Sequence, residues 1–197
     1  RVGRENVVNA TIGALLDDDG KLMVLSSVSD VFKTLDMADC AEYAPIAGTP
    51  GFREAVKKDL FRNFKPECFV EAIASPGGTG ALKNAISNYT DFGDKILAAD
   101  WHWGPYKTIA QEHGRNLVTF SMFDEEGRFN KKSFEEKVSE LMREQDRLAV
   151  IINTPAHNPT GYELSSEDWE AVSQVLGETD KNKKITLIAD IAYIDFA

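Results

Sequence analysis

Apolar residues occur in short, regularly spaced runs over most of this chain, and stretches rich in polar residues, glycine or proline separate them. Five runs have the length and apolar character of buried strands, at residues 70–74, 95–99, 116–120, 148–152 and 184–189. Between them, the spacing favours helices at 81–89, 106–113, 133–142 and 167–176, the last capped by Ser165 or Ser166. This alternation predicts an α/β fold of three layers, in which helices flank a mostly parallel sheet.

The chain before residue 70 is less regular. An acidic turn is expected at 17–20, a short helix at 31–40, and a longer helix at 51–64, with Thr49 as its cap and Pro50 as its first residue. The irregular start leads us to assign residues 1–25 to a different domain from residues 26–197.

Composition narrows the class of protein. The 197 residues are 43% hydrophobic and 27% charged, which is ordinary for a globular protein. The net charge of −10 argues against nucleic acid or an anionic membrane as a partner, and we expect neither a membrane span nor a signal peptide. The first residue is Arg1 rather than Met, which is compatible with a trimmed start.

Cysteine and histidine usage adds two expectations. Cys40 and Cys68 fit free thiols in a reducing compartment, and we predict a cytoplasmic location. The three histidines and two cysteines have no metal-ligand spacing, so no metal site is predicted.

The strand at 148–152 runs into a stiff polar loop, with the sequence IINTPAHNPTG at 151–161. In an open α/β sheet, such a loop presents ligand-binding groups. We expect extended backbone at Ala156 and Asn158, and Asn158 carries a short amide suited to one directed hydrogen bond. An ordinary strand-to-helix turn is the open alternative.

The segment SPGGTG at 75–80 precedes a predicted helix. Gly78 and Thr79 would offer backbone N–H groups and a hydroxyl to an anion at the positive end of the helix dipole. The segment lacks the GK[ST] ending of a nucleotide P-loop, and a plain glycine turn stays open.

Three more side chains follow predicted strands. Trp103 offers a flat face to a planar ring, whereas Trp101 is the candidate for core packing. Asp190 ends the last strand, and Tyr193 lies three residues further on. Singly, each has an ordinary alternative: core or interface tryptophans, a solvated carboxylate and a packed phenol.

The strand ends at Ser75, Asp100, Asn153 and Asp190 should share one edge of the sheet. Together they would supply an anion cradle, an aromatic plate, an amide and a carboxylate. That set suits a planar, cationic, phosphorylated ring.

In their order, the segments NATIG, YAPIAGTPGF, SPGGTGAL, DWHWGPYK, HNPTG and DIAYIDFA resemble the class I aminotransferases among the fold-type I pyridoxal-phosphate (PLP) enzymes, most closely the aspartate and aromatic branch. The likeness extends from about Asn9 to Ala197. It implies PLP as the cofactor, amino transfer between an amino acid and a 2-oxo acid in amino acid metabolism, and a homodimer. It also implies that residues 26–197 are the first part of the large domain, with 1–25 in a small domain.

The resemblance implies a role for each matching residue. Gly78 and Thr79 match the groups that hold the cofactor phosphate, and Trp103 matches the stacked tryptophan. Asp190 matches the partner of the protonated ring nitrogen, which keeps the ring an electron sink.

Both Asn158 and Tyr193 match groups that bond the ring hydroxyl oxygen. Tyr43 matches a tyrosine that reaches the partner subunit's cofactor phosphate. For substrate binding, the resemblance implicates Gly13, in a mobile segment that closes over the substrate, together with Trp103 and Asn158.

There are also departures. The family commonly has Asn-His after the stacking tryptophan, whereas Pro105 and Tyr106 stand here, so the hydrogen bond to the aspartate is altered or supplied otherwise. We interpret His157 as structural. The resemblance implies that the family's Schiff-base lysine and carboxylate-binding arginines lie downstream of Ala197. Lys95, Lys107 and Lys184 are not at the matching position.

Two alternatives stay open. The chain could be a non-catalytic module that binds phosphate or cofactor, or the scaffold could serve a β-lyase or decarboxylase. The motifs do not separate aspartate from aromatic amino donors.

Overall fold

The computed structural model describes residues 13–196, which fall in two compact units divided between Thr49 and Pro50. We describe each unit by itself. The NATIG segment lies almost wholly outside the described residues, as does about half of the predicted domain at 1–25. The predicted boundary after residue 25 stays a prediction.

The first unit contains a tight turn and two short helices. The backbone N–H of Gly20 donates to Asp17 O at 2.9 Å, and an antiparallel bridge joins Leu16 and Leu22, so the predicted acidic turn is confirmed. Helix α1 spans Ser26–Thr34 and helix α2 spans Met37–Ala41, where the sequence predicted one helix at 31–40. The side chain of Asp36, which accepts from the Ala38 N–H, begins α2 as a new helix.

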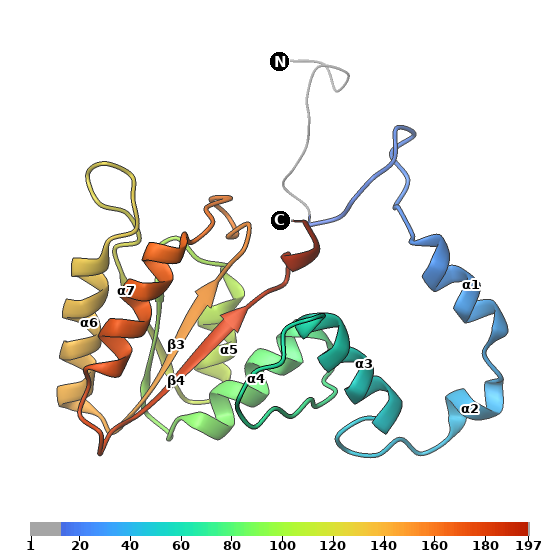
Figure 1. Ribbon diagram of the computed structural model, residues 1–197, viewed down its shortest axis with the longest axis horizontal. Coiled ribbons are helices and arrows are strands. Elements are labelled where there is room, and N and C mark those ends of the chain that lie inside the picture. Colours follow the sequence, from blue (N-terminus) through green and yellow to red (C-terminus); the bar gives the residue numbers. More distant parts are fainter. Residues whose placement is uncertain (1–12, 197) are drawn as a thin grey trace. The chain divides into compact units, whose positions relative to one another are not determined.

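The second unit is built around a sheet of four parallel strands in the order β2-β1-β3-β4 (Figure 1). The strands are β1 (Lys95–Ala99), β2 (Asn116–Phe120), β3 (Arg147–Asn153) and β4 (Lys184–Asp190). In β1 and β3, alternate apolar residues are buried against opposite faces, as a sheet covered on both sides requires. The predicted fold class is therefore confirmed.

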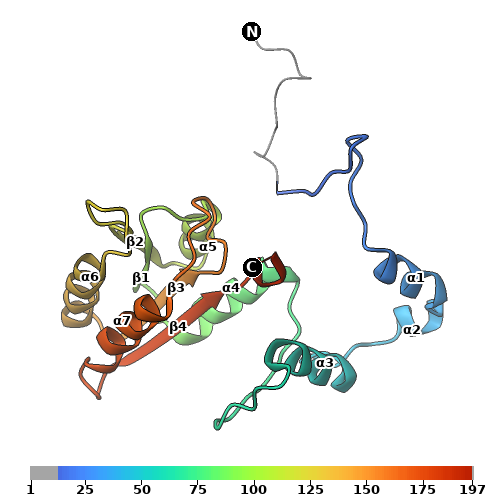
Figure 2. The same cartoon turned by 45° about the horizontal axis from the view of Figure 1, so that its top comes forward.

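Two pairs of helices cover the sheet (Figures 1 and 2). Helices α6 (Lys131–Glu144) and α7 (Ser166–Gly177) lie on one face, where Phe134 and Val172 reach the core. Helices α4 (Gly77–Tyr89) and α5 (Pro105–Glu112) lie on the other, with Ile86, Tyr106 and Ile109 in the core. The unit begins with α3 (Pro50–Phe61) and ends with the short 3-10 helix η2 (Ile194–Phe196).

One predicted strand is absent from the described part of the chain. Residues 70–74 pair with no strand there, so the prediction of a strand at this position is wrong. Instead, the Arg53 guanidinium of α3 donates to the carbonyl oxygen of Ala72 at 2.7 Å and pairs with Glu71. A strand forms only where a second strand satisfies its backbone groups, and apolar character alone does not supply that partner.

Among the described residues, no helix is both long and apolar enough to cross a membrane. In that same part of the chain, no cluster of three or more histidine, cysteine or acidic side chains is arranged to hold a metal ion. Cys40 and Cys68 are both exposed free thiols.

Candidate active site

The parallel sheet brings the ends of three strands to one edge. In the register of the sheet, Asn153 on β3 lies opposite Asp190 on β4, and Asp100 directly follows β1. The predicted convergence of Asp100, Asn153 and Asp190 is therefore confirmed. The prediction that Ser75 lies at the same edge rested on a strand at 70–74, and that strand does not form.

Asp190 is held by a tyrosine from the helix beside it. The Tyr106 hydroxyl of α5 donates a hydrogen bond to Asp190 Oδ2, and the Ala192 N–H donates to Oδ1 at 3.3 Å. Burial, followed by the hydrogen bond and the charge of Asp190, raises the pKa of the Tyr106 phenol well above its ordinary value. The phenol therefore stays protonated and remains a donor. Where the family commonly has Asn-His, this chain has Pro105 and Tyr106, and the sequence left open which group bonds the aspartate. That group is Tyr106.

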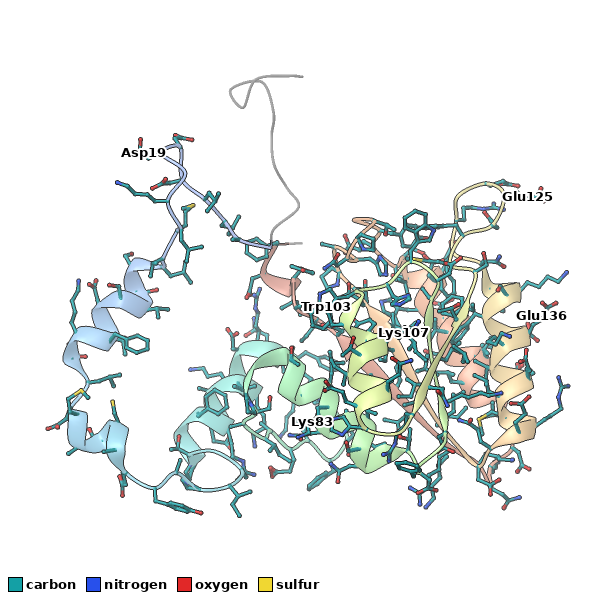
Figure 3. All side chains as sticks on the ribbon, turned by 180° about the vertical axis from the view of Figure 1, so that it is seen from behind. Asp19, Lys83, Trp103, Lys107, Glu125 and Glu136 are labelled. Atoms are coloured by element: carbon teal, nitrogen blue, oxygen red, sulfur yellow. The ribbon has the colours of Figure 1, made fainter. Side chains whose placement is uncertain are left out.

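Trp103 lies two residues before the start of α5 and contacts the same tyrosine. The two rings meet edge to face, with centroids 5.6 Å apart and an interplanar angle of 83°. Figure 3 labels Trp103 and, on the following helix, the exposed Lys107. Trp103 is partly buried, whereas Trp101 is 55% exposed, so core packing of Trp101 is wrong. Tyr106 thus links Trp103 to Asp190 through direct contacts.

The proline-rich loop brings Asn158 to Tyr193. The side-chain amide of Asn158 donates to the Tyr193 hydroxyl at 3.2 Å, and its backbone N–H donates to Asn153 Oδ1 at 2.7 Å. The chain coils directly after β4, which turns Tyr193 towards this loop. The side chains of Asn158 and Tyr193, 35 residues apart in sequence, are therefore in direct contact.

Ala156 has a φ of 49°, so the expectation of extended backbone there is wrong. The physical reason is that Ala156 follows Pro155, whereas the steric restriction acts on the residue before a proline.

His157 is buried, with 5% of its surface exposed, and its Nδ1 lies 2.8 Å from Thr160 Oγ1. Burial is the main cause that lowers its pKa below the ordinary value of 6.5. A neutral histidine bonded within its own loop agrees with a structural role.

The first turn of α4 contains Gly78 and Thr79, both exposed. On either side, the N–H of Gly77 donates to Ser75 O and that of Gly80 to Pro76 O. Because the first N–H groups of a helix have no intrahelical acceptor, those of Gly78 and Thr79 are available to an anion. Neither residue belongs to the hydrogen-bonded group around Asp190 and Asn158.

Gly13 and Tyr43 belong to the first unit and are exposed, Tyr43 to 91%. The predicted roles of Gly13 and Tyr43 therefore stay predictions.

Lys95 and Lys184 are the first residues of β1 and β4, at the opposite edge of the sheet. Lys95 pairs there with Glu144. Neither can serve a ligand at the carboxyl edge.

Sequence reasoning did not assign a site role to Asn153 or Tyr106. Asn153 was recognised as a strand end and Tyr106 as a departure from the family pattern. Their partner, Asp190, lies 37 and 84 residues away, respectively. The polar residue that directly follows the apolar run at 148–152 is the signal that could have pointed to Asn153.

The family model described as "Aminotransferase class I and II" matches residues 5–197. This chain belongs to that family. A cytoplasmic aspartate aminotransferase of Caenorhabditis elegans is 30% identical over 96% of this chain and 47% of its own length. An aromatic-amino-acid aminotransferase of Escherichia coli is 27% identical over 98% of this chain and 49% of its own.

Among solved structures, an aminotransferase from Anaerococcus prevotii is 48% identical, with a TM-score of 0.94 over 99% of this chain and 48% of that one. The chain thus spans about half the length of the aminotransferases that it matches. The family match confirms the resemblance found from the motifs.

Proposed function

We propose that this chain carries most of the PLP pocket of an aminotransferase, which moves an amino group between an amino acid of aspartate or aromatic type and a 2-oxo acid. The family match supports this activity, and the pocket is supported by the residues gathered at one edge of the sheet. The observation that carries the proposal is the chain of contacts from Trp103 through Tyr106 to Asp190, beside the bonded pair of Asn158 and Tyr193.

The donor set fits PLP. An indole face, a carboxylate, and an amide bonded to a phenol suit a flat ring with a cationic nitrogen and a hydroxyl oxygen. The free N–H groups of Gly78 and Thr79, at the positive end of a 13-residue helix, suit its phosphate. When bound, PLP would supply the electron sink that stabilises negative charge at the substrate Cα.

Each residue has a proposed task. Trp103 covers one face of the ring, and Asp190 stabilises the proton on the ring nitrogen by opposite charge. Asn158 and Tyr193 bond the ring hydroxyl oxygen, and their mutual hydrogen bond aligns them for it. Trp103 and Asn158 also border the substrate.

Tyr43 and Gly13 keep their predicted tasks as proposals: contact with the cofactor phosphate of a partner subunit, and closure over the substrate. The homodimer rests on Tyr43 alone. We place the Schiff-base lysine and the carboxylate-binding arginines beyond Ala197. The cytoplasmic location stays a prediction, because the relatives include proteins named cytoplasmic and mitochondrial.

The test uses the full-length protein loaded with PLP and mixed in turn with L-aspartate, L-tyrosine and L-phenylalanine. We expect equal amounts of 2-oxo acid and pyridoxamine phosphate, measured by chromatography. Asp190→Asn should lower the rate by at least about 100-fold, since it removes the charge that holds the ring proton. The matched control Asp195→Asn changes an exposed carboxylate five residues further on and should leave the rate unchanged.

Absence of conversion with all common amino acids would contradict the proposal and favour a non-catalytic binding module. Release of ammonia or of an amine, without pyridoxamine phosphate, would instead identify a β-lyase or a decarboxylase.

A further inference from the structure

Tyr106 is almost fully buried, with 1% of its surface exposed, yet its hydroxyl makes a hydrogen bond at the sheet edge. Its ring packs in the core on the α4–α5 face of the sheet, among residues that include Ile86 and Ile109. A side chain anchored this way has one conformation, because rotation would displace close-packed neighbours. The hydroxyl is therefore a fixed point rather than an adaptable surface group.

The orientation of the Asp190 carboxylate depends on a hydrogen-bond donor that is itself fixed. Its carboxylate is partly exposed, at the last residue of a strand that borders the sheet. A carboxylate accepts about four hydrogen bonds. Tyr106 and the N–H of Ala192 occupy one site on each oxygen, which fixes the plane of the group and leaves acceptor capacity for a ligand.

The Tyr106 hydroxyl also remains a hydrogen-bond donor when the pH changes. Its raised pKa keeps the phenol protonated throughout the ordinary working range of pH, so the hydrogen bond does not depend on titration of the donor. A donor that stays neutral also adds no positive charge that would compete with a cationic ligand for Asp190.

We propose that Tyr106 is a positioning residue that orients the Asp190 carboxylate towards the ring nitrogen of PLP; this inference rests on the proposed function. Tyr106 acts through Asp190 and touches neither the substrate nor the reacting atoms. Its edge contact with Trp103 is a separate effect, which the phenyl ring alone retains.

The test uses the full-length protein with Tyr106→Phe, which removes only the hydroxyl. Tyr162→Phe is the matched control, because the Tyr162 hydroxyl also donates to a carboxylate, Asp168 Oδ2, at 2.9 Å, and neither side chain has a proposed role in cofactor binding. The readouts are the ¹⁵N NMR shift of PLP labelled at its ring nitrogen, the PLP dissociation constant, and the unfolding transition of the cofactor-free protein.

For Tyr106→Phe, we expect the ¹⁵N signal to move towards that of a neutral pyridine and PLP to bind about tenfold more weakly, the factor that corresponds to about 1.4 kcal/mol. Tyr162→Phe should leave both unchanged. In an Asp190→Asn background, Tyr106→Phe should have no further effect on PLP affinity, because the hydroxyl then has no carboxylate to orient.

An unchanged ¹⁵N signal in Tyr106→Phe would overturn the proposal. So would an equal loss of affinity with and without Asp190→Asn, since that additivity would indicate a purely structural role. If the unsubstituted protein takes up no PLP, the proposed function itself fails, and this inference with it.

Discussion

The side-chain amide of Asn153 donates a hydrogen bond of 2.8 Å to the backbone carbonyl oxygen of Asp190. Its carbonyl oxygen also accepts the backbone N–H of Asn158 at 2.7 Å. One buried side chain therefore joins the end of β3 to both the end of β4 and the proline-rich loop. This amide holds the spacing between Asn158 and Asp190, the two residues proposed to bond opposite parts of the cofactor ring.

Replacing this amide should loosen the sheet edge. We expect Asn153→Ala to lower the free energy of unfolding by about 1–3 kcal/mol, because it leaves the Asn158 N–H without its acceptor and removes a donor to Asp190. Urea titration followed by circular dichroism measures the effect. Asn88→Ala is the control: Asn88 also donates to a backbone carbonyl, at 2.7 Å, but is exposed, so its loss should cost less than about 0.5 kcal/mol. Equal effects would refute a special role for Asn153.

Gly80 should tolerate no side chain. A Cβ atom at Gly80 would lie 2.7 Å from Cδ of the rigid Pro76 ring, whereas nothing lies within 4 Å of a Cβ at Gly78. Gly80→Ala should therefore destabilise the protein by about 1–3 kcal/mol. Gly78→Ala should stay within about 1 kcal/mol of the parent, with helix propensity favouring alanine. Thermal unfolding of both variants checks the contrast, and a neutral Gly80→Ala would show that the first turn of α4 adjusts freely.

Helix α7 should depend on one of its two adjacent serines. Ser165 Oγ accepts the Asp168 N–H at 3.1 Å, and Asp168 Oδ2 accepts the Ser165 N–H at 3.0 Å, which completes a capping box. Ser165→Ala should lower stability by about 1 kcal/mol. Ser166→Ala, one residue inside the helix, should change it by less than about 0.5 kcal/mol. Denaturant midpoints of the two variants provide the measurement, and a reversed order would refute this assignment of the cap.

His157 should make the protein less stable in mild acid. Its pKa in the folded state is below 6.5, mainly because of burial, so the unfolded chain binds the proton more readily. The contribution to stability is complete above pH 6.5 and is lost as the pH falls below that value. We expect His157→Asn to flatten the dependence of the unfolding free energy on pH between about 7 and 5. An identical slope in the variant and the parent would contradict this assignment.

The sequence alone determined most of the regular elements and the family. Strands β1 and β2 begin and end where the runs at 95–99 and 116–120 predicted. In β1, the four residues after Lys95 are apolar and buried, as a strand covered by helices on both faces requires. Helix ends followed local signals, as in Gly114, which directly follows the cap of α5 with a φ of 68°. The motif order also predicted Trp103, Asn158, Asp190 and Tyr193 as candidates, and the fold gathers these four.

Only the tertiary structure decided which groups pair. The segment at 70–74 has the composition of a strand but finds no partner strand among the described residues, and Arg53 satisfies the carbonyl of Ala72 instead. The hydrogen bonds of Tyr106 and Asn153 to Asp190 have no local signature, because their partners are 84 and 37 residues apart. Periodicity and capping arise from neighbours within about one turn or strand, whereas a polar pair at a sheet edge depends on strand order and register, which the packing of the whole core selects.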